Sequence, residues 1–146
     1  MTDALTSTPL AAKDERDHGV SLARLYILRA GFVIMAAGMF HTVPHVLNPD
    51  LTERGMLDSM THGLSVICLL GVRYPLQMLP IFLFEFVWKS LWTFNYGLPQ
   101  WMMGGRTPQL QEDLILIGAA SVVFALVIPW DHAYRRYIKQ PGDRWR

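Results

Sequence analysis

The feature that most constrains this chain is an uninterrupted apolar run toward its C-terminal end. Residues 114–130 read LILIGAASVVFALVIPW and include no charged side chain. At 1.5 Å per residue, a helix over this run is about 25 Å long, which is within the range of membrane-spanning helices. A surface helix of a soluble protein has a polar face, and this run has none. The run therefore predicts a helix that crosses a membrane.

Three further apolar segments are long enough to cross a membrane, at residues 22–40, 55–72 and 75–94. Pro44 and Pro49 mark a loop after the first segment, and a Gly- and Pro-rich stretch precedes the fourth. Only Arg73 and Tyr74 separate the second segment from the third, so we expect these two helices to form a tight hairpin. The sequence predicts an all-α, integral membrane four-helix bundle that residues 1–146 form as one domain.

The cationic residues predict the orientation of this bundle. Four spans put both polar tails, residues 1–21 and 131–146, on the same side of the lipid bilayer. The tails and the turn at Arg73 carry most of the lysines and arginines, whereas the other side carries Arg54 and Arg106. Because cationic segments stay in the cytoplasm, both termini are expected to be cytoplasmic. The mixed charge of the N-terminal tail also disfavours a cleavable signal peptide.

The overall composition excludes several classes of protein. The formal net charge is +1, which is far from the strongly basic surface that a nucleic-acid partner requires. The single cysteine, Cys68, can form neither an intramolecular disulfide nor a cysteine metal cluster. There is no Gly-rich phosphate loop, nucleophile elbow or Ser/His/Asp set at readable spacing. A non-enzymatic role is therefore favoured, and an enzyme would have to use the polar residues of the spans.

The polar residues inside the predicted spans are the candidate functional residues. Glu85 and Lys89 stand four residues apart in the third span, which places them on one face of a helix. At 1.5 Å per residue, Glu85 lies about 15 Å from the cytoplasmic face and Lys89 about 21 Å. His62 of the second span lies near the depth of Lys89, with Asp58 one turn away. We therefore predict one polar cluster of these four residues, with Arg29 of the first span within reach of Glu85.

The first hypothesis for this cluster is structural. An ion pair between Glu85 and Lys89 neutralises both charges and fixes how the third helix packs, and such pairs inside bundles need not be catalytic. The chain is then a non-enzymatic structural or accessory membrane subunit. Such a subunit acts beside a membrane protein partner or as a homo-oligomer.

The second hypothesis is proton-linked transport. A carboxyl group in mid-membrane can gain and lose a proton near neutral pH, as histidine does, so Glu85 and His62 form a candidate proton relay. The chain is then a transporter or channel component. Four helices leave little room for a solute path, so this hypothesis requires an oligomer or a partner.

The third hypothesis is a metal or haem centre. His41 and His45 stand four residues apart near the outer end of the first span, and His62 adds a third imidazole. Imidazole binds haem iron and several transition metals, so these three histidines are candidate ligands. Pro44 lies between the first two, and no HExxH motif accompanies them, so the sequence favours a protein without a cofactor.

Two stretches carry a resemblance to a known group of proteins. They read RYPLQMLPIFLFEFVWK from residue 73 and PGDRWR from residue 141. In these stretches the chain resembles a family of small bacterial four-span inner-membrane proteins of uncharacterised function. The family's Arg-Tyr-Pro turn and the glutamate and lysine of its third helix match Arg73, Tyr74, Pro75, Glu85 and Lys89. The resemblance implies a bacterial inner-membrane location and no particular activity. A weaker likeness to DoxX-like four-helix membrane proteins rests on size, span count and Arg29.

Overall fold

The structure is a computed structural model that describes residues 16–17, 19–47 and 53–142, and it is mostly helical. Its helices are α1 (Leu22–Leu47), α2 (Glu53–Arg73), α3 (Leu79–Trp92), η1 (Thr93–Gly97), α4 (Leu98–Met102), α5 (Pro108–Val127), α6 (Trp130–Tyr134) and η2 (Arg135–Lys139). Before α1, a short antiparallel ladder pairs β1 (Arg16–Asp17) with β2 (Val20–Ser21). The all-α class that the sequence predicts is confirmed.

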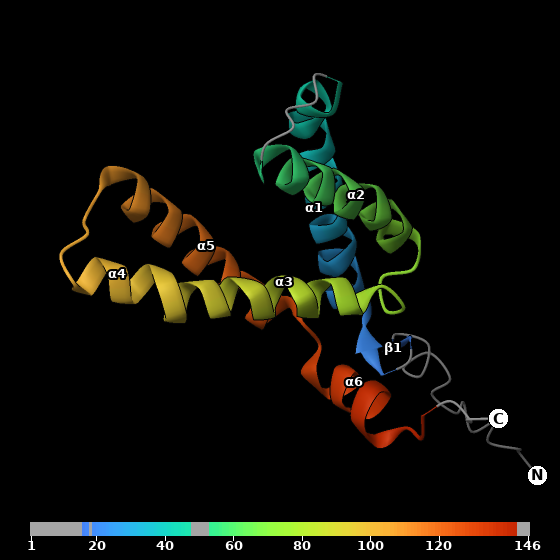
Figure 1. Ribbon diagram of the computed structural model, residues 1–146. Coiled ribbons are helices and arrows are strands. Elements are labelled where there is room, and N and C mark those ends of the chain that lie inside the picture. Colours follow the sequence, from blue (N-terminus) through green and yellow to red (C-terminus); the bar gives the residue numbers. More distant parts are fainter. Residues whose placement is uncertain (1–15, 18, 48–52, 143–146) are drawn as a thin grey trace, which may run out of the picture.

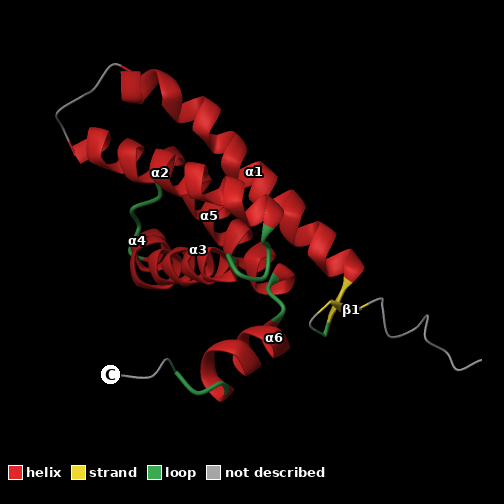
Figure 2. Cartoon of the chain, turned by 90° about the vertical axis from the view of Figure 1, so that its right-hand side faces the viewer, coloured by secondary structure: helices red, strands yellow, loops and turns green. Residues whose placement is uncertain are grey.

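The long helices pack as two pairs, α1 with α2 and α3 with α5. In Figure 1, α3 continues through η1 into α4 as one rod, and α5 returns beside it. Figure 2 views α3 end-on while α1 runs along the page, so α3 crosses α1 steeply. The expected side-by-side hairpin of the second and third helices is therefore wrong. The turn over residues 74–78 directs α3 away from α2. As a result α3 packs against α5, while α2 packs against α1.

Three prolines lie at or near places where the helix boundaries differ from the predicted ones. Pro80 lies in the first turn of α3, where a missing N–H removes no helical hydrogen bond, so the helix tolerates it there. Pro99 occupies the same position in α4, and the rod continues to Met102 where the sequence predicts a loop. Pro44 lies inside α1, which reaches Leu47 although the predicted span ends at residue 40.

The helix α5 begins earlier than the predicted fourth span. The Thr107 hydroxyl accepts a hydrogen bond from the Leu110 N–H at 3.2 Å, which caps the helix, and Pro108 is the first helical residue. Glu112 and Asp113 therefore follow the first turn of α5. The region after residue 130, expected as a polar tail, continues as the helical segments α6 and η2.

Arg24 at the start of α1 closes the C-terminal end of α5. Its guanidinium donates to the carbonyl oxygens of Leu126, Val127 and Ile128 at 3.1, 3.3 and 3.0 Å. The last carbonyl groups of a helix lack partners within the helix, and a cation near them also interacts favourably with the helix dipole. Arg24 therefore ties the beginning of α1 to the end of α5.

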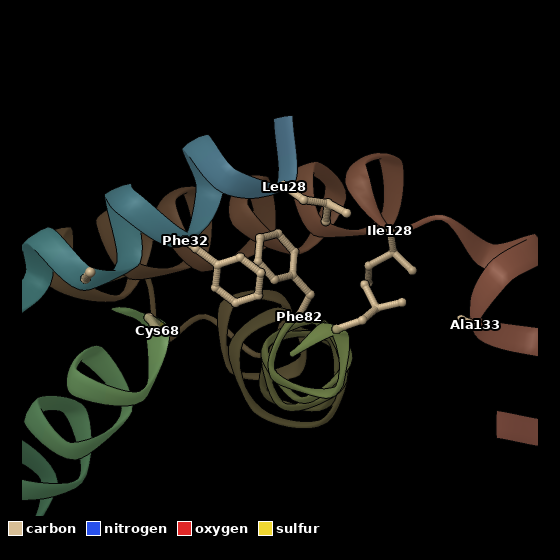
Figure 3. Close-up of a cluster of buried hydrophobic side chains, with 8 residues drawn as sticks. Leu28, Phe32, Cys68, Phe82, Ile128 and Ala133 are labelled. Carbon is tan, nitrogen blue, oxygen red and sulfur yellow. The ribbon is translucent and has the colours of Figure 1, made fainter. Parts of the chain in front are cut away.

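Aromatic rings join the two helix pairs. The Phe82 ring of α3 meets the Phe32 ring of α1 edge-on, with 4.6 Å between centroids, and the Phe124 ring of α5 at 5.2 Å. Figure 3 shows Phe82 and Phe32 side by side, with Ile128 close by. The buried cluster around these rings consists of Leu28, Phe32, Ala36, Cys68, Leu79, Phe82, Ile128 and Ala133.

Two glycines allow the rings to approach the neighbouring backbone. A Cβ at Gly31 would lie 2.6 Å from Cζ of Phe82, and a Cβ at Gly71 of α2 would overlap the Phe32 ring. No side chain fits at either position without displacing an aromatic ring. The close packing of α2 on α1 therefore depends on Gly71.

We predict that Gly71→Ala lowers the free energy of unfolding by about 1–3 kcal/mol, because the new methyl group overpacks the Phe32 ring. Gly63→Ala is the matched control on the same helix, since a Cβ there meets nothing within 4 Å. Alanine also has the better helix propensity, so this control should unfold at the same temperature or higher. Thermal unfolding of both purified variants tests the prediction, and equal midpoints would contradict it.

Candidate functional site

One face of α3 carries both the core and a buried charge. Leu79, Phe82 and Glu85 recur every three residues and are the buried residues of this helix. Glu85 is 6% exposed, which is unusual for a carboxylate and requires a partner. The buried face of α3 therefore carries two apolar side chains followed by an ionisable one.

The partner of Glu85 is Lys89, one turn further along the same helix. Lys89 Nζ donates a hydrogen bond to Oε2 of Glu85 and forms an ion pair with it. The same ammonium lies 4.1 Å from the centroid of the Trp88 ring and 5.3 Å from that of Phe124. A cation over an aromatic face is stabilised by the ring's quadrupole. The positive charge is thus held between a carboxylate and two rings, one of them from α5.

Hydroxyl groups continue the polar contact between α3 and α5. The Oγ atoms of Ser90 and Ser121 are 2.7 Å apart and share a hydrogen bond across the two helices. Thr93 follows one turn later, and its buried Oγ1 has no hydrogen-bond partner among the residues described. A Cβ at Gly118 would lie 3.9 Å from Cγ2 of Thr93. Small and hydroxyl-bearing residues therefore line the contact beyond the ion pair.

The structure brings together only part of the predicted cluster. Glu85 and Lys89 are in contact, whereas the Arg29 guanidinium lies 5.6 Å from the centroid of the Tyr26 ring. Arg29 also lines a small recess beside the turn after α2, and within the described part of the chain it forms no ion pair with Glu85. His62 and Asp58 are half-buried on α2, whose packing partner is α1. Whether these two residues act together with Lys89 stays a prediction.

The candidate metal ligands are only partly visible. The side chains of His41 and His45 lie outside the described residues. Across the parts of the chain that the structure does describe, no three His, Cys, Asp or Glu side chains gather in a group suited to a metal ion. The hypothesis of a metal or haem centre therefore has no support from geometry and stays untested.

Sequence reasoning missed the groups that α5 contributes to this site. Glu85 and Lys89 are found from their spacing, but Phe124 and Ser121 stand inside a charge-free run and look like ordinary span residues. The available signal was Ser121, a hydroxyl in the middle of an apolar helix. Such a group needs a partner when buried, and Ser90 is that partner.

Comparisons of the chain with family models, curated proteins and solved structures found no match in any of the three. As it stands, the site holds a self-neutralised charge pair, covered by aromatic rings and bordered by two hydroxyls. The Ser90–Ser121 hydrogen bond and the contact of Lys89 with the Phe124 ring link α3 to α5.

We predict that Lys89→Met lowers the free energy of unfolding by about 3–5 kcal/mol, because it leaves the buried Glu85 carboxylate without its cation. Arg106→Met is the matched control, since Arg106 is exposed and its guanidinium stacks on Trp101 at 4.6 Å. The control should lose less than about 1 kcal/mol. Denaturant unfolding of the two variants provides the comparison, and similar losses would show that Lys89 is not needed to balance Glu85.

Proposed function

We propose that this chain is a four-span protein of a bacterial inner membrane, with both termini in the cytoplasm, and that it acts as a non-enzymatic structural or accessory subunit. The observation that carries the proposal is the Glu85–Lys89 ion pair, which is neutralised within α3 and covered by α5. Its partner is a second membrane protein or another copy of the chain.

The exposed faces of two helices support the membrane location. The segments Gly55–Arg73 and Pro108–Val127 are long and apolar enough to cross a bilayer, yet only 17% and 6% of their most apolar windows are buried inside the protein. On α5, Leu116 and Leu126 are 71% and 73% exposed. A core helix of a soluble protein would bury such residues, and large exposed apolar surfaces mark contacts with membranes or partners.

The lengths of the other two helices are compatible with spans, although the steep crossing of α3 over α1 means that both helices cannot lie along the membrane normal. The helix α1 has 26 residues, which is about 39 Å at 1.5 Å per residue. The α-helical part of α3 has 14 residues and is too short alone, but the rod over residues 79–102 is about 36 Å long. Both lengths exceed the roughly 30 Å of the hydrocarbon core.

The packing of α3 on α5 is of the kind that lipid favours. Lipid tails are as apolar as leucine, so helices in a bilayer associate through close packing and hydrogen bonds. Here the contact uses the Ser90–Ser121 hydrogen bond and Gly118. At Gly97, a Cβ would lie 2.9 Å from Cδ1 of Leu114, so the glycine allows the first half of α5 to approach the rod.

The Glu85–Lys89 pair supports a structural role over a catalytic one. Each charge has its partner one helical turn away, and Lys89 has two aromatic rings as further neighbours. A catalytic carboxylate needs access to a substrate, whereas Glu85 is 6% exposed. Such a pair gives α3 one preferred rotation against α5, because any other rotation would expose both charges to lipid.

We predict that the full chain, expressed in a Gram-negative host, stays in the inner-membrane fraction after washing with sodium carbonate and dissolves only with detergent. A fluorescent protein fused to either terminus should fluoresce, and alkaline phosphatase fused there should be inactive, since both termini are cytoplasmic. Release of the chain by carbonate would contradict the membrane proposal. Active phosphatase at one terminus would contradict the four-span topology.

We predict that the double variant Glu85→Gln/Lys89→Met recovers most of the stability lost in Lys89→Met, to within about 1 kcal/mol of the natural protein. Replacing both members of a buried ion pair leaves no uncompensated charge, so the loss is smaller than for one member. Unfolding of the four members of this double-mutant cycle gives the coupling energy.

A role in proton transport predicts proton flux across the membrane, which proteoliposomes with an internal pH dye can measure. Proton flux through the natural protein that Glu85→Gln abolishes would contradict the structural role.

A further inference from the structure

A large pocket opens at the end of the molecule away from the Glu85–Lys89 ion pair of α3. Its volume is about 700 Å³, and it lies between the turn after α2 and the C-terminal segments α6 and η2. Ligand pockets commonly have volumes of about 300–1,000 Å³. A recess of about 140 Å³ lies beside it, and Leu76 and Gln77 line both spaces. The turn thus forms a shared wall between them.

The permanently charged residues around these two spaces are all arginines. His132, Arg135 and Arg136 line the large pocket, and Arg29 and Arg73 line the recess, while no carboxylate lines either space. Within the described ranges of the chain, none of these five residues forms an ion pair with an aspartate or glutamate. This contrasts with the neutralised Glu85–Lys89 pair within α3 and leaves four arginines around these two spaces without a carboxylate partner in the portion of the chain that the structure describes.

Much of the hydrogen-bonding capacity of these arginines remains unused. Arg135 donates from Nε to the backbone oxygen of Asp131 at 3.1 Å, and Arg136 donates from Nη1 to Oε1 of Gln140 at 2.8 Å. Arg73 donates from Nε to the Tyr74 hydroxyl at 3.0 Å. These bonds hold each guanidinium in position. A guanidinium has five N–H donors, so most of them remain for a ligand.

Neutral donors complete the wall of the large pocket. Gln77 and Gln140 contribute amide groups, and Tyr137 contributes a hydroxyl. Burial raises the pKa of Tyr137 above its ordinary value of about 10, against the opposing effect of Arg136, so the hydroxyl stays protonated and can donate a hydrogen bond at neutral pH. A ligand with several anionic oxygens meets donors from both the turn and η2.

We propose that this pocket binds a phosphate group, carried either by an anionic phospholipid or by a small phosphorylated molecule. The planar guanidinium matches the geometry of phosphate oxygens and binds them through paired hydrogen bonds. The lipid source rests on the membrane location proposed above, because cationic clusters at the cytoplasmic ends of spans meet anionic headgroups. The phosphate chemistry itself does not depend on that location, nor on the role of Glu85.

The test uses the full chain purified in a neutral detergent and two kinds of probe. Phosphatidylglycerol is compared with phosphatidylcholine by native mass spectrometry, and inorganic phosphate is titrated by calorimetry. The variants Arg135→Gln and Arg136→Gln each remove one pocket cation. Lys139→Gln is the matched control, because Lys139 is exposed on the same segment, lies near the Tyr134 ring and does not line the pocket.

We expect each pocket variant to bind its probe about tenfold more weakly, as the loss of one charge-assisted hydrogen bond predicts, and Lys139→Gln to change binding less than about twofold. Gln77→Glu, which places a negative charge on the opposite wall, should weaken binding in the same way. All four positions are exposed, and thermal unfolding checks that each variant is folded.

The outcomes separate the two sources of phosphate. Preference for phosphatidylglycerol over phosphatidylcholine that the pocket variants remove supports a lipid headgroup. Binding of inorganic phosphate that the same variants weaken, without any lipid preference, supports a small phosphorylated molecule. If neither probe binds, or if Lys139→Gln weakens binding as much as Arg135→Gln and Arg136→Gln do, the proposal is overturned.

Discussion

The fold depends on an aromatic contact, because the Phe82 ring packs against rings of both helix pairs. Its ring touches Phe32 of α1 and Phe124 of α5, and it lies where Gly31 leaves room for it. Edge-to-face rings favour defined geometries, so the contact sets how α3 crosses α1. Gly71 of α2 then accommodates Phe32, and in this way all four long helices share a single cluster.

The charged site grows directly from this aromatic contact. Glu85 follows Phe82 by three residues on the buried face of α3, and the Phe124 ring contacts Phe82 while lying below the Lys89 ammonium. One ring of α5 therefore serves both the apolar cluster and the ion pair. The consequence is that α3 cannot rotate against α5 without breaking both, which is why we interpret the pair as part of the packing. Ser90 and Ser121 add a hydrogen bond with the same directional requirement.

Helices and contacts between residues close in the sequence could be predicted, whereas contacts between distant segments could not. The all-α class and the contact of Glu85 with Lys89 follow from apolar runs and from i, i+4 spacing. The pairing of α3 with α5 depends on Phe124, Ser121 and Gly118, which have no distinguishing signal inside an apolar run. The contact of Arg24 with the C-terminal end of α5 also has no signal in the sequence, since any unfilled helix end can accept an arginine.

Charged residues are arranged differently in the interior of the molecule and at its end near η2. In the interior, a buried ionised group needs a partner, and Glu85 has Lys89 one helical turn away. Near η2 the arginines are exposed to solvent, so cations such as Arg135 and Arg136 can gather without carboxylates. Repulsion among these cations destabilises the folded state, and a bound anion would reduce this repulsion. The proposed structural role therefore falls to the interior pair, and the proposed phosphate site falls to the arginines near η2, where a bound anion would interact most favourably.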